Sequence, residues 1–289
     1  MKRKLQRSIA RAALVPALFL GTLGLAAHAE EAAAPALALA PAATSGTPAA
    51  PALEQAAPFP VTFNATTDVV SRYVWRGILQ NPDACVQPSA TATWQGLSLN
   101  VWGNYATSDW GANRKNNFSE VDYTGSYNYV FKDLPVVKSL SLTGGFIWYA
   151  FPNNPVCNNT KEFFATAALN DLWLTPAISA YYDVDEADGW YLNAGLGHTF
   201  QLIDKVSLNL GATVGWNDSN ESQFYYGVDQ SGFADLGLGA TLNYNITETL
   251  VASVYYKYSY ILDNDLRESA NSWQSGDQSV FGARLSYSF

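Results

Sequence analysis

The sequence contains little of the chemistry that enzymes commonly use. Its 289 residues include two histidines, two cysteines and one methionine, and His198 is the only histidine after residue 28. No G-x-S-x-G elbow, HExxH zinc motif or paired-cysteine metal spacing is present. We therefore expect no metal site, no cofactor and no enzymatic activity, and we interpret His198 as an interfacial residue. A lipid-modifying enzyme is a third and more distant hypothesis.

Long apolar runs are also missing, except at the N-terminus. There Lys2, Arg3, Lys4, Arg7 and Arg11 precede an apolar stretch over residues 12–27, which ends in Ala27-His28-Ala29. A basic start, a short apolar core and small residues at its end are typical of a secretory signal peptide. We predict a signal peptide over residues 1–29, and the protein is therefore expected to be exported.

Basic residues are scarce in the rest of the chain. The sequence has 16 Lys and Arg against 25 Asp and Glu. The signal peptide holds five of these bases and no acid, so the remainder carries 11 − 25 = −14. Binding to nucleic acid needs a basic surface, and we expect no such partner.

Residues 30–60 have a different composition, dominated by Ala and Pro. Such a segment lacks the apolar side chains needed for a packed core, and we interpret it as a disordered linker. A plug or an anchor to another envelope component is the alternative interpretation.

From Val61 to Phe289 the dominant pattern is an alternation of apolar with small or polar residues. A period of two is the side-chain period of a β-strand, and about 9–11 residues of tilted strand cross a bilayer. The pattern predicts an all-β fold, a transmembrane antiparallel up-and-down β-barrel with about 12 strands in one domain, residues 61–289. The predicted strands are 61–76, 86–95, 97–107, 118–131, 138–151, 161–170, 174–184, 189–200, 205–216, 232–244, 248–261 and 277–289.

Three further features favour this barrel over a soluble β-sandwich. Tight connections such as Gln95-Gly96 largely alternate with long ones, as periplasmic turns alternate with outer loops. Aromatic residues gather near strand ends, where they suit the headgroup level of a membrane; these are Trp75, Trp94, Trp148, Trp190, Trp216, Tyr244 and Phe289. The chain ends on an aromatic residue, which resembles the assembly signal of outer-membrane barrels. We expect the bacterial outer membrane as the location, and the barrel-assembly machinery as a partner that engages the Phe289 strand.

The opposite parity of the strands predicts the residues that line the lumen. Charges that are buried without partners are costly, so these side chains should face water or one another. Two interpretations stay open: basic and acidic walls that create a transverse field in a narrow pore, or charges that pair across the lumen and hold the barrel shut. The predicted pore-lining residues are Asp68, Arg72, Arg76, Lys257 and Arg284 on one wall, with Asp122, Glu162, Asp183, Asp235, Tyr149, Tyr181 and Tyr191 near the outer mouth.

The two cysteines, Cys85 and Cys157, fall at the same end of the predicted barrel. An exported chain meets an oxidising compartment, and we predict a disulfide between them, with free or differently paired thiols as the alternative.

A heptapeptide at the end of the first predicted strand indicates a family. Ser71-Arg72-Tyr73-Val74-Trp75-Arg76-Gly77 resembles the S-D-Y-V-[FW]-R-G signature of the TorF-type outer-membrane porin family, many of whose members are conserved hypothetical barrel proteins. Arg72 stands where the family pattern has an acidic residue. The resemblance implies a pore-like role.

We therefore predict a porin-like outer-membrane channel for passive diffusion of small polar solutes. The alternative is a closed structural or adhesin-like barrel whose outer loops bind a partner or lipopolysaccharide. In both cases outer-membrane lipid and lipopolysaccharide surround the protein, and the outer-loop acids could share divalent cations with lipopolysaccharide, although a solvated acidic surface is the simpler explanation.

Overall fold

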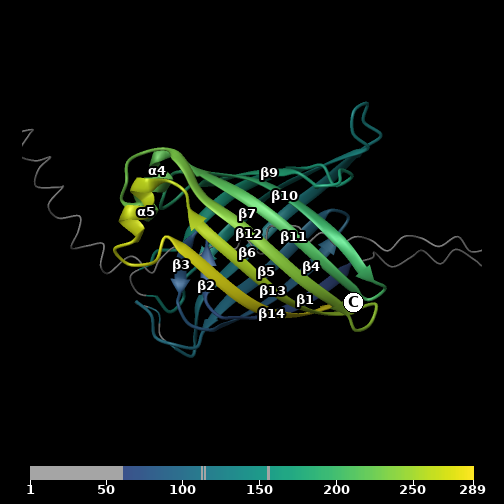
Figure 1. Ribbon diagram of the computed structural model, residues 1–289, viewed down its shortest axis with the longest axis horizontal. Helices are drawn as coiled ribbons and strands as arrows, with labels where there is room; N and C mark the ends of the chain where they lie inside the picture. The colour runs from purple at the N-terminus through teal and green to yellow at the C-terminus, as the bar shows by residue number, and fades with distance from the viewer. Residues whose placement is uncertain (1–60, 112, 114, 155–156) are drawn as a thin grey trace, which may run out of the picture.

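The computed structural model describes residues 61–111, 113, 115–154 and 157–289. The signal peptide and linker predicted for residues 1–60 lie outside these described residues. The chain forms a closed antiparallel barrel in which consecutive strands are neighbours and the first strand, β1, pairs with the last, β14 (Figure 1). The barrel strands are β1 (Thr62–Val70), β4 (Cys85–Trp94), β5 (Leu97–Ala106), β6 (Asn117–Lys132), β7 (Ser139–Ala150), β8 (Thr160–Ala168), β9 (Ala177–Asp183), β10 (Trp190–Ile203), β11 (Val206–Asn217), β12 (Gly232–Asn245), β13 (Leu250–Ile261) and β14 (Asp277–Ser288).

The barrel confirms the predicted fold class and the count of twelve strands. Eleven of the strands match their predicted ranges to within about three residues at either end, because each is one unbroken run of alternating side chains. At the seam, Asn64 pairs with Ser288, and the ring of Phe289 stacks on that of Phe63 at 5.5 Å. Closure leaves no strand edge unpaired, as a sheet in lipid requires.

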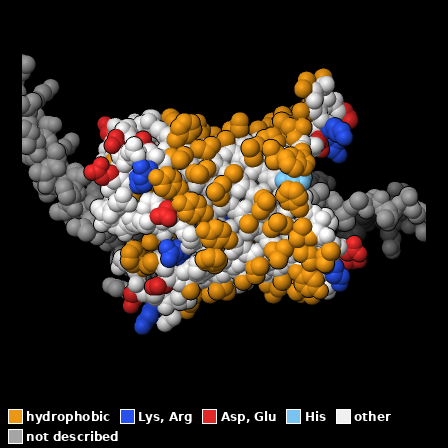
Figure 2. Space-filling model, in the orientation of Figure 1, with side chains coloured by type: hydrophobic (Ala, Val, Ile, Leu, Met, Phe, Trp, Pro, Cys, Tyr) orange, Lys and Arg blue, Asp and Glu red, His pale blue; other side chains and the backbone are white. Residues whose placement is uncertain are grey.

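The outer surface of the barrel is apolar. Alternate residues such as Val69, Leu142 and Val254 are exposed, whereas their neighbours turn inward. In Figure 2 hydrophobic side chains cover the middle of the barrel, and acidic and basic side chains gather toward its two ends. Trp94, Trp148, Trp190, Tyr244 and Phe289 lie on this surface with more than a third of their area exposed, in accord with the predicted aromatic belts.

The two ends of the barrel differ in their connections. At one end, short turns connect neighbouring strands. Between β4 and β5, for example, Gln95 and Gly96 both have positive φ angles, 46° and 90°, as a two-residue hairpin turn requires. At the other end, long loops carry two short helices, α4 (Ser219–Tyr226) and α5 (Asn264–Ala270) (Figure 1). Among the described residues, no helix is both long enough and apolar enough to cross a membrane.

The first predicted strand is the one that the structure corrects. We predicted a single strand over residues 61–76, but β1 ends at Val70 and the chain then leaves the barrel wall. It forms a small separate hairpin, β2 (Tyr73–Trp75) and β3 (Ile78–Asn81), which lies inside the barrel at the helical end (Figure 1). Trp75 is only 3% exposed, so its predicted place in the outer aromatic belt is wrong. We call residues 71–84 the inner hairpin.

Candidate functional site

The tip of the inner hairpin is a two-residue turn formed by Arg76 and Gly77. Trp75 pairs with Ile78, and the φ angles of Arg76 and Gly77 are 42° and 79°. Positive φ is unfavourable for a residue with a side chain, so the surrounding contacts must hold Arg76 in place. A Cβ on Gly77 would lie 3.2 Å from the Cβ of Asp235 on β12, which shows how closely the turn approaches the wall.

Arg76 is the centre of a buried ionic cluster. Its guanidinium donates to both carboxylate oxygens of Glu162 on β8 at 3.0 Å and to Glu221 of α4 at 2.9 Å. The hydroxyl of Tyr149 also donates to Glu162, at 2.8 Å. These hydrogen bonds are charge-assisted because the donor is a guanidinium, and they are shielded from water because the two carboxyl groups are only 1% exposed. The cluster thus ties the hairpin both to the wall and to an outer loop.

Aromatic rings enclose the same guanidinium. The carbon centre of the Arg76 guanidinium lies 4.2 Å from the Trp75 ring centroid, 4.8 Å from that of Tyr181 and 4.0 Å from that of Tyr191. The hydroxyl of Tyr191 donates to Asp235 at 3.0 Å. A desolvated cation is attracted to the faces of such rings, which adds to the ion pairs.

Helices α4 and α5 cover the hairpin from outside. Gln274, which follows α5, accepts a hydrogen bond from the backbone N–H of Leu79 at 2.6 Å and donates to the carbonyl of Gly77 at 2.9 Å. Helix α4 begins at its N-cap residue Asp218, whose side chain accepts from the N–H of Glu221. Burial raises the pKa of Glu221 to about 8, with Arg76 acting in the opposite direction and Glu162 adding to the rise. One guanidinium therefore serves two buried carboxyl groups, and at Glu221 burial outweighs the effect of Arg76 on the pKa.

A second ionic group lies on the wall near the seam. The Arg284 Nε donates to both oxygens of Asp68, at 2.9 and 3.0 Å, and the hydroxyl of Tyr255 donates to Asp68 at 2.8 Å. The Nζ of Lys257 lies 5.2 Å from the Tyr255 ring centroid. Asp68 and Arg284 are direct partners across the β1–β14 seam, so this pair is local to one wall.

The charged residues are therefore not arranged as two opposed walls. Arg76 lies among Glu162, Tyr149, Tyr181, Tyr191 and Asp235 and is not on the wall of β1, because the chain turns inward after Val70. Arg72 is also beyond β1, where it donates to Gln278 at 2.9 Å. Both were predicted as wall residues of the first strand, and that placement is wrong.

Two further predicted acids, Asp183 and Asp122, lie beside Glu162 of the Arg76 cluster. Asp183 accepts from the hydroxyl of Thr160 at 2.6 Å and from backbone N–H groups of residues 185–187, so it organises the β9–β10 loop. Asp122 is fully buried on β6. The sequence pattern did not single out Glu221, which is one of the outer-loop acids, or Glu120 and Gln274. The Asp218-x-x-Glu221 spacing, a helix-start pattern, could have indicated α4.

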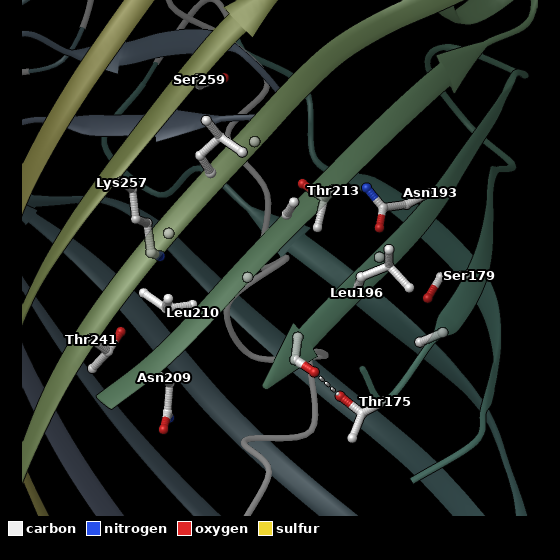
Figure 3. A pocket seen from close by; sticks show the side chains of 18 of the residues that line it. Thr175, Ser179, Asn193, Leu196, Asn209, Leu210, Thr213, Thr241, Lys257 and Ser259 are labelled. Atoms are coloured by element: carbon white, nitrogen blue, oxygen red, sulfur yellow. Dashed lines mark hydrogen bonds between the residues drawn. The ribbon is translucent and has the colours of Figure 1, made fainter. Parts of the chain in front are cut away.

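Below the inner hairpin the lumen contains a cavity of about 740 Å³. Its lining extends from Arg76 and Trp102 to Thr175 in the β8–β9 turn, at the opposite end of the barrel. Figure 3 shows Ser179, Asn193, Thr213, Thr241 and Lys257 along this space, with Thr175 donating to the carbonyl of Gly197. Glycines on β10–β12 place no side chain into the lumen. At Gly239, an added Cβ would meet no atom within 4 Å. The cavity is thus lined by hydroxyl, amide and glycine positions together with apolar side chains such as Trp102 and Leu172.

The structure does not contain the predicted disulfide. No disulfide joins Cys85 to Cys157. The thiol of Cys85 donates to the carbonyl of Asp83 at 3.5 Å, and that of Cys157 donates to the carbonyl of Asn158 at 3.6 Å. Cys85 is the first residue of β4 and not part of a loop, and its side chain is fully buried in the core at the outer end of the lumen. Burial also raises the pKa of the Cys157 thiol, which disfavours the thiolate needed for exchange.

His198 lies on the outer surface near the end closed by short turns. Its Nδ1 is 2.5 Å from the carbonyl oxygen of Trp173, and its ring packs 4.5 Å from that of Phe200. Within the described residues, no group of three or more His, Cys, Asp and Glu is placed to hold a metal ion.

A closed barrel with an apolar outer surface, aromatic strand ends and a polar interior defines a class: the protein is an outer-membrane β-barrel. Within that class, the chain belongs to the family described as "Bacterial protein of unknown function (Gcw_chp)", which it matches over residues 54–281. The TorF-type resemblance stays a prediction.

A search of curated proteins found no match. Among solved structures, the chain is similar to the KdgM porin, with 12% identity over 79% of this chain and 99% of that one and a TM-score of 0.46. It is also similar to the NanC porin, with 13% identity over 78% of this chain and 98% of that one and a TM-score of 0.47. A third similar structure is an outer membrane channel from Pseudomonas putida F1, with 12% identity over 84% of this chain and 100% of that one and a TM-score of 0.46. At these identities the similarity concerns the fold alone.

Proposed function

We propose that the protein is a porin-like channel for passive diffusion of small polar solutes, narrowed at its outer end by the inner hairpin. The observation that supports this function is the cavity of about 740 Å³, which extends from the hairpin tip to the opposite end of the barrel. Hydroxyl and amide groups can replace the water around a polar solute as it passes. A barrel that served only as a scaffold would have no need of such a space.

The inner hairpin sets the size limit of this channel. Arg76, Trp75 and the rings of Tyr181 and Tyr191 fill the outer part of the lumen. A solute must pass beside this cluster, so we expect a low conductance. Of the predicted pore-lining residues, Lys257 also lines this cavity, and a solute that has passed the cluster would meet it there.

Single-channel recording in planar bilayers tests the proposal. Refolded barrel should give small, discrete current steps, and a variant without the inner hairpin should give larger ones. If correctly folded protein, checked by its heat-dependent mobility in SDS gels, gives no current with or without the hairpin, the channel function is wrong.

The second candidate function is a closed barrel that acts through its outer loops. It is favoured by the bidentate pairing of Arg76 with Glu162, which locks the hairpin across the lumen. In that case wild-type protein would be silent in bilayers, and it would bind lipopolysaccharide or a cell-surface partner through the loops around α4 and α5.

A further inference from the structure

The cavity below the inner hairpin reaches the end of the barrel where short turns connect the strands, which we call the short-turn end. Its lining there includes Asn170 and Thr175 of the β8–β9 turn. In the other direction the lining stops at residues 73–77 of the hairpin and includes no residue of α4 or α5. A ligand that enters from the short-turn end therefore reaches the cavity without passing the Arg76 cluster.

The N-terminal part of the chain joins the barrel at this same end. Thr62, the first residue of β1, pairs with Thr93 next to the β4–β5 turn. Phe63 exchanges two backbone hydrogen bonds with the C-terminal Phe289, at 2.8 and 2.9 Å. Residues 30–60, which lie outside the described residues, directly precede this point. Whatever fills the cavity from this end must share the rim with residues 30–60.

The distance from β1 to the cavity is short. In the barrel, only β14 and β13 separate β1 from β12, which lines the cavity through Gly237, Gly239 and Thr241. Three strand spacings amount to about 14 Å along the wall. An extended chain advances about 3.1 Å per residue, so about five residues cover this distance. Residues 30–60 are therefore long enough to enter the cavity and to run along it.

The composition of residues 30–60 suits a narrow polar cavity. They include 13 alanines and six prolines. Proline has no N–H group, and the extended conformation that it favours has no internal hydrogen bonds, so carbonyl oxygens are left to accept bonds from elsewhere. Side chains that can donate hydrogen bonds line the cavity on four neighbouring strands; Figure 3 shows Ser179, Asn193, Thr213 and Thr241.

A row of glycines provides room for a second backbone. Gly197 pairs with Gly211, and Gly211 pairs with Gly239, so three adjacent strands have no side chain at this level of the lumen. Glycine is favoured where another backbone approaches closely. At the hairpin end, the rings of Tyr73 and Trp102 lie 5.5 Å apart and both line the cavity. Proline-rich segments dock on aromatic rings of this kind with little loss of chain entropy.

The charges are complementary as well. The charged residues in the lining of the cavity are two bases, Arg76 and Lys257, and one acid, Asp235. Lys257 lies directly beside Gly239 in the neighbouring strand. Residues 30–60 contain three Glu and no Lys or Arg. Opposite net charges favour an encounter between the segment and the cavity.

We propose that residues 30–60 enter the lumen from the short-turn end and occupy the cavity as an internal plug. The segment would compete with solutes for the same space and so restrict their passage. The inference holds whether or not the lumen conducts, because occupancy of the cavity does not require a current.

Disulfide cross-linking in the full-length mature chain tests where the segment lies. The L53C/T241C variant places one thiol in the segment and one in the cavity. The control, L53C/L242C, moves the second thiol by one residue to the outer surface, where Leu242 is 42% exposed. Leu53 is eight residues before Val61, which corresponds to about 25 Å of extended chain. After mild oxidation, mass spectrometry of proteolytic peptides should find the disulfide within one chain for L53C/T241C and not for L53C/L242C.

Thiol labelling measures occupancy without depending on the depth of Leu53. The T241C variant reacts with a small water-soluble maleimide, in the mature chain and in a variant that also lacks residues 32–57. If the segment fills the cavity about nine-tenths of the time, the deletion should raise the labelling rate roughly tenfold. V136C is the control, because Val136 is 93% exposed in the β6–β7 turn and its labelling rate should not change.

Each outcome decides the proposal. A faster T241C reaction after the deletion, with an unchanged V136C reaction, supports it even where Leu53 lies at another depth and forms no disulfide. An unchanged T241C rate would overturn it. Equal disulfide yields from T241C and L242C would place the segment outside the lumen, and a disulfide between two chains would place the segment of a second copy there; both results would also overturn it. Since neither measurement needs a current, failure of the plug is distinct from failure of the channel function.

Discussion

Replacing Arg76 with alanine is the change that most directly tests how the inner hairpin is held. The substitution leaves Glu162 and Glu221 buried side by side without their shared guanidinium, and it removes the stacking on Tyr181 and Tyr191. Removing one partner of a buried ion pair costs about 3–5 kcal/mol, because the remaining charge is left uncompensated. We expect R76A to lower the free energy of unfolding by about that amount.

Urea unfolding of the refolded barrel, followed by tryptophan fluorescence, measures this loss. The control is K161A, which breaks the ion pair of Lys161 with Asp185. The two side chains of this pair are 44% and 36% exposed, so K161A should lower the free energy of unfolding by about 1 kcal/mol or less. The triple variant R76M/E162Q/E221Q removes the charges together and should recover much of the stability.

If R76A costs no more than K161A, the buried ion pairs do not hold the hairpin. If the triple variant is as unstable as R76A, the loss of stability does not come from uncompensated charge. Because the same contacts hold the hairpin across the lumen, R76A should increase single-channel conductance as well.

Three further predictions concern pH, lumen width and side-chain parity. Burial raises the pKa of Glu221 to about 8. The stability that protonated Glu221 contributes is present below the unfolded pKa near 4.5 and is lost as the pH rises through about 8. The free energy of unfolding, measured from pH 5 to 9, should therefore fall in wild type and fall less in E221Q. Leucine at Gly239 would meet no atom at its Cβ, so G239L should fold normally and reduce conductance, and an unchanged conductance would place the solute path elsewhere. Spin labels at Leu142 and Thr143 in reconstituted barrel should report lipid and water respectively, and equal polarity at both positions would contradict the assigned register.

Much of the fold could be predicted because a barrel strand carries its own signal. Each transmembrane segment has lipid on one side and the lumen on the other, so the alternation is written locally into residues such as Leu142 and Thr143. The turn Gln95-Gly96 was predicted for the same reason, since two residues with positive φ between strands favour glycine.

The inner hairpin could not be predicted in this way, although its turn carries a similar signal. Trp75-Arg76-Gly77-Ile78 resembles Trp94-Gln95-Gly96-Leu97, and both form two-residue turns. We interpreted the first as the end of a wall strand because Tyr73 and Trp75 continue its alternation. A hairpin packed inside the lumen has the same period as a strand facing lipid, so periodicity does not distinguish them.

The sequence by itself determined the number of barrel strands, their parity and the apolar outer surface, because these depend on neighbours a few residues apart. Only the tertiary structure decided where Arg76 lies, since its partners Glu162 and Glu221 are 86 and 145 residues away along the chain. A buried charge is stable only where distant segments supply its counter-charge. The location of such a residue therefore follows from the assembled barrel and not from any single strand.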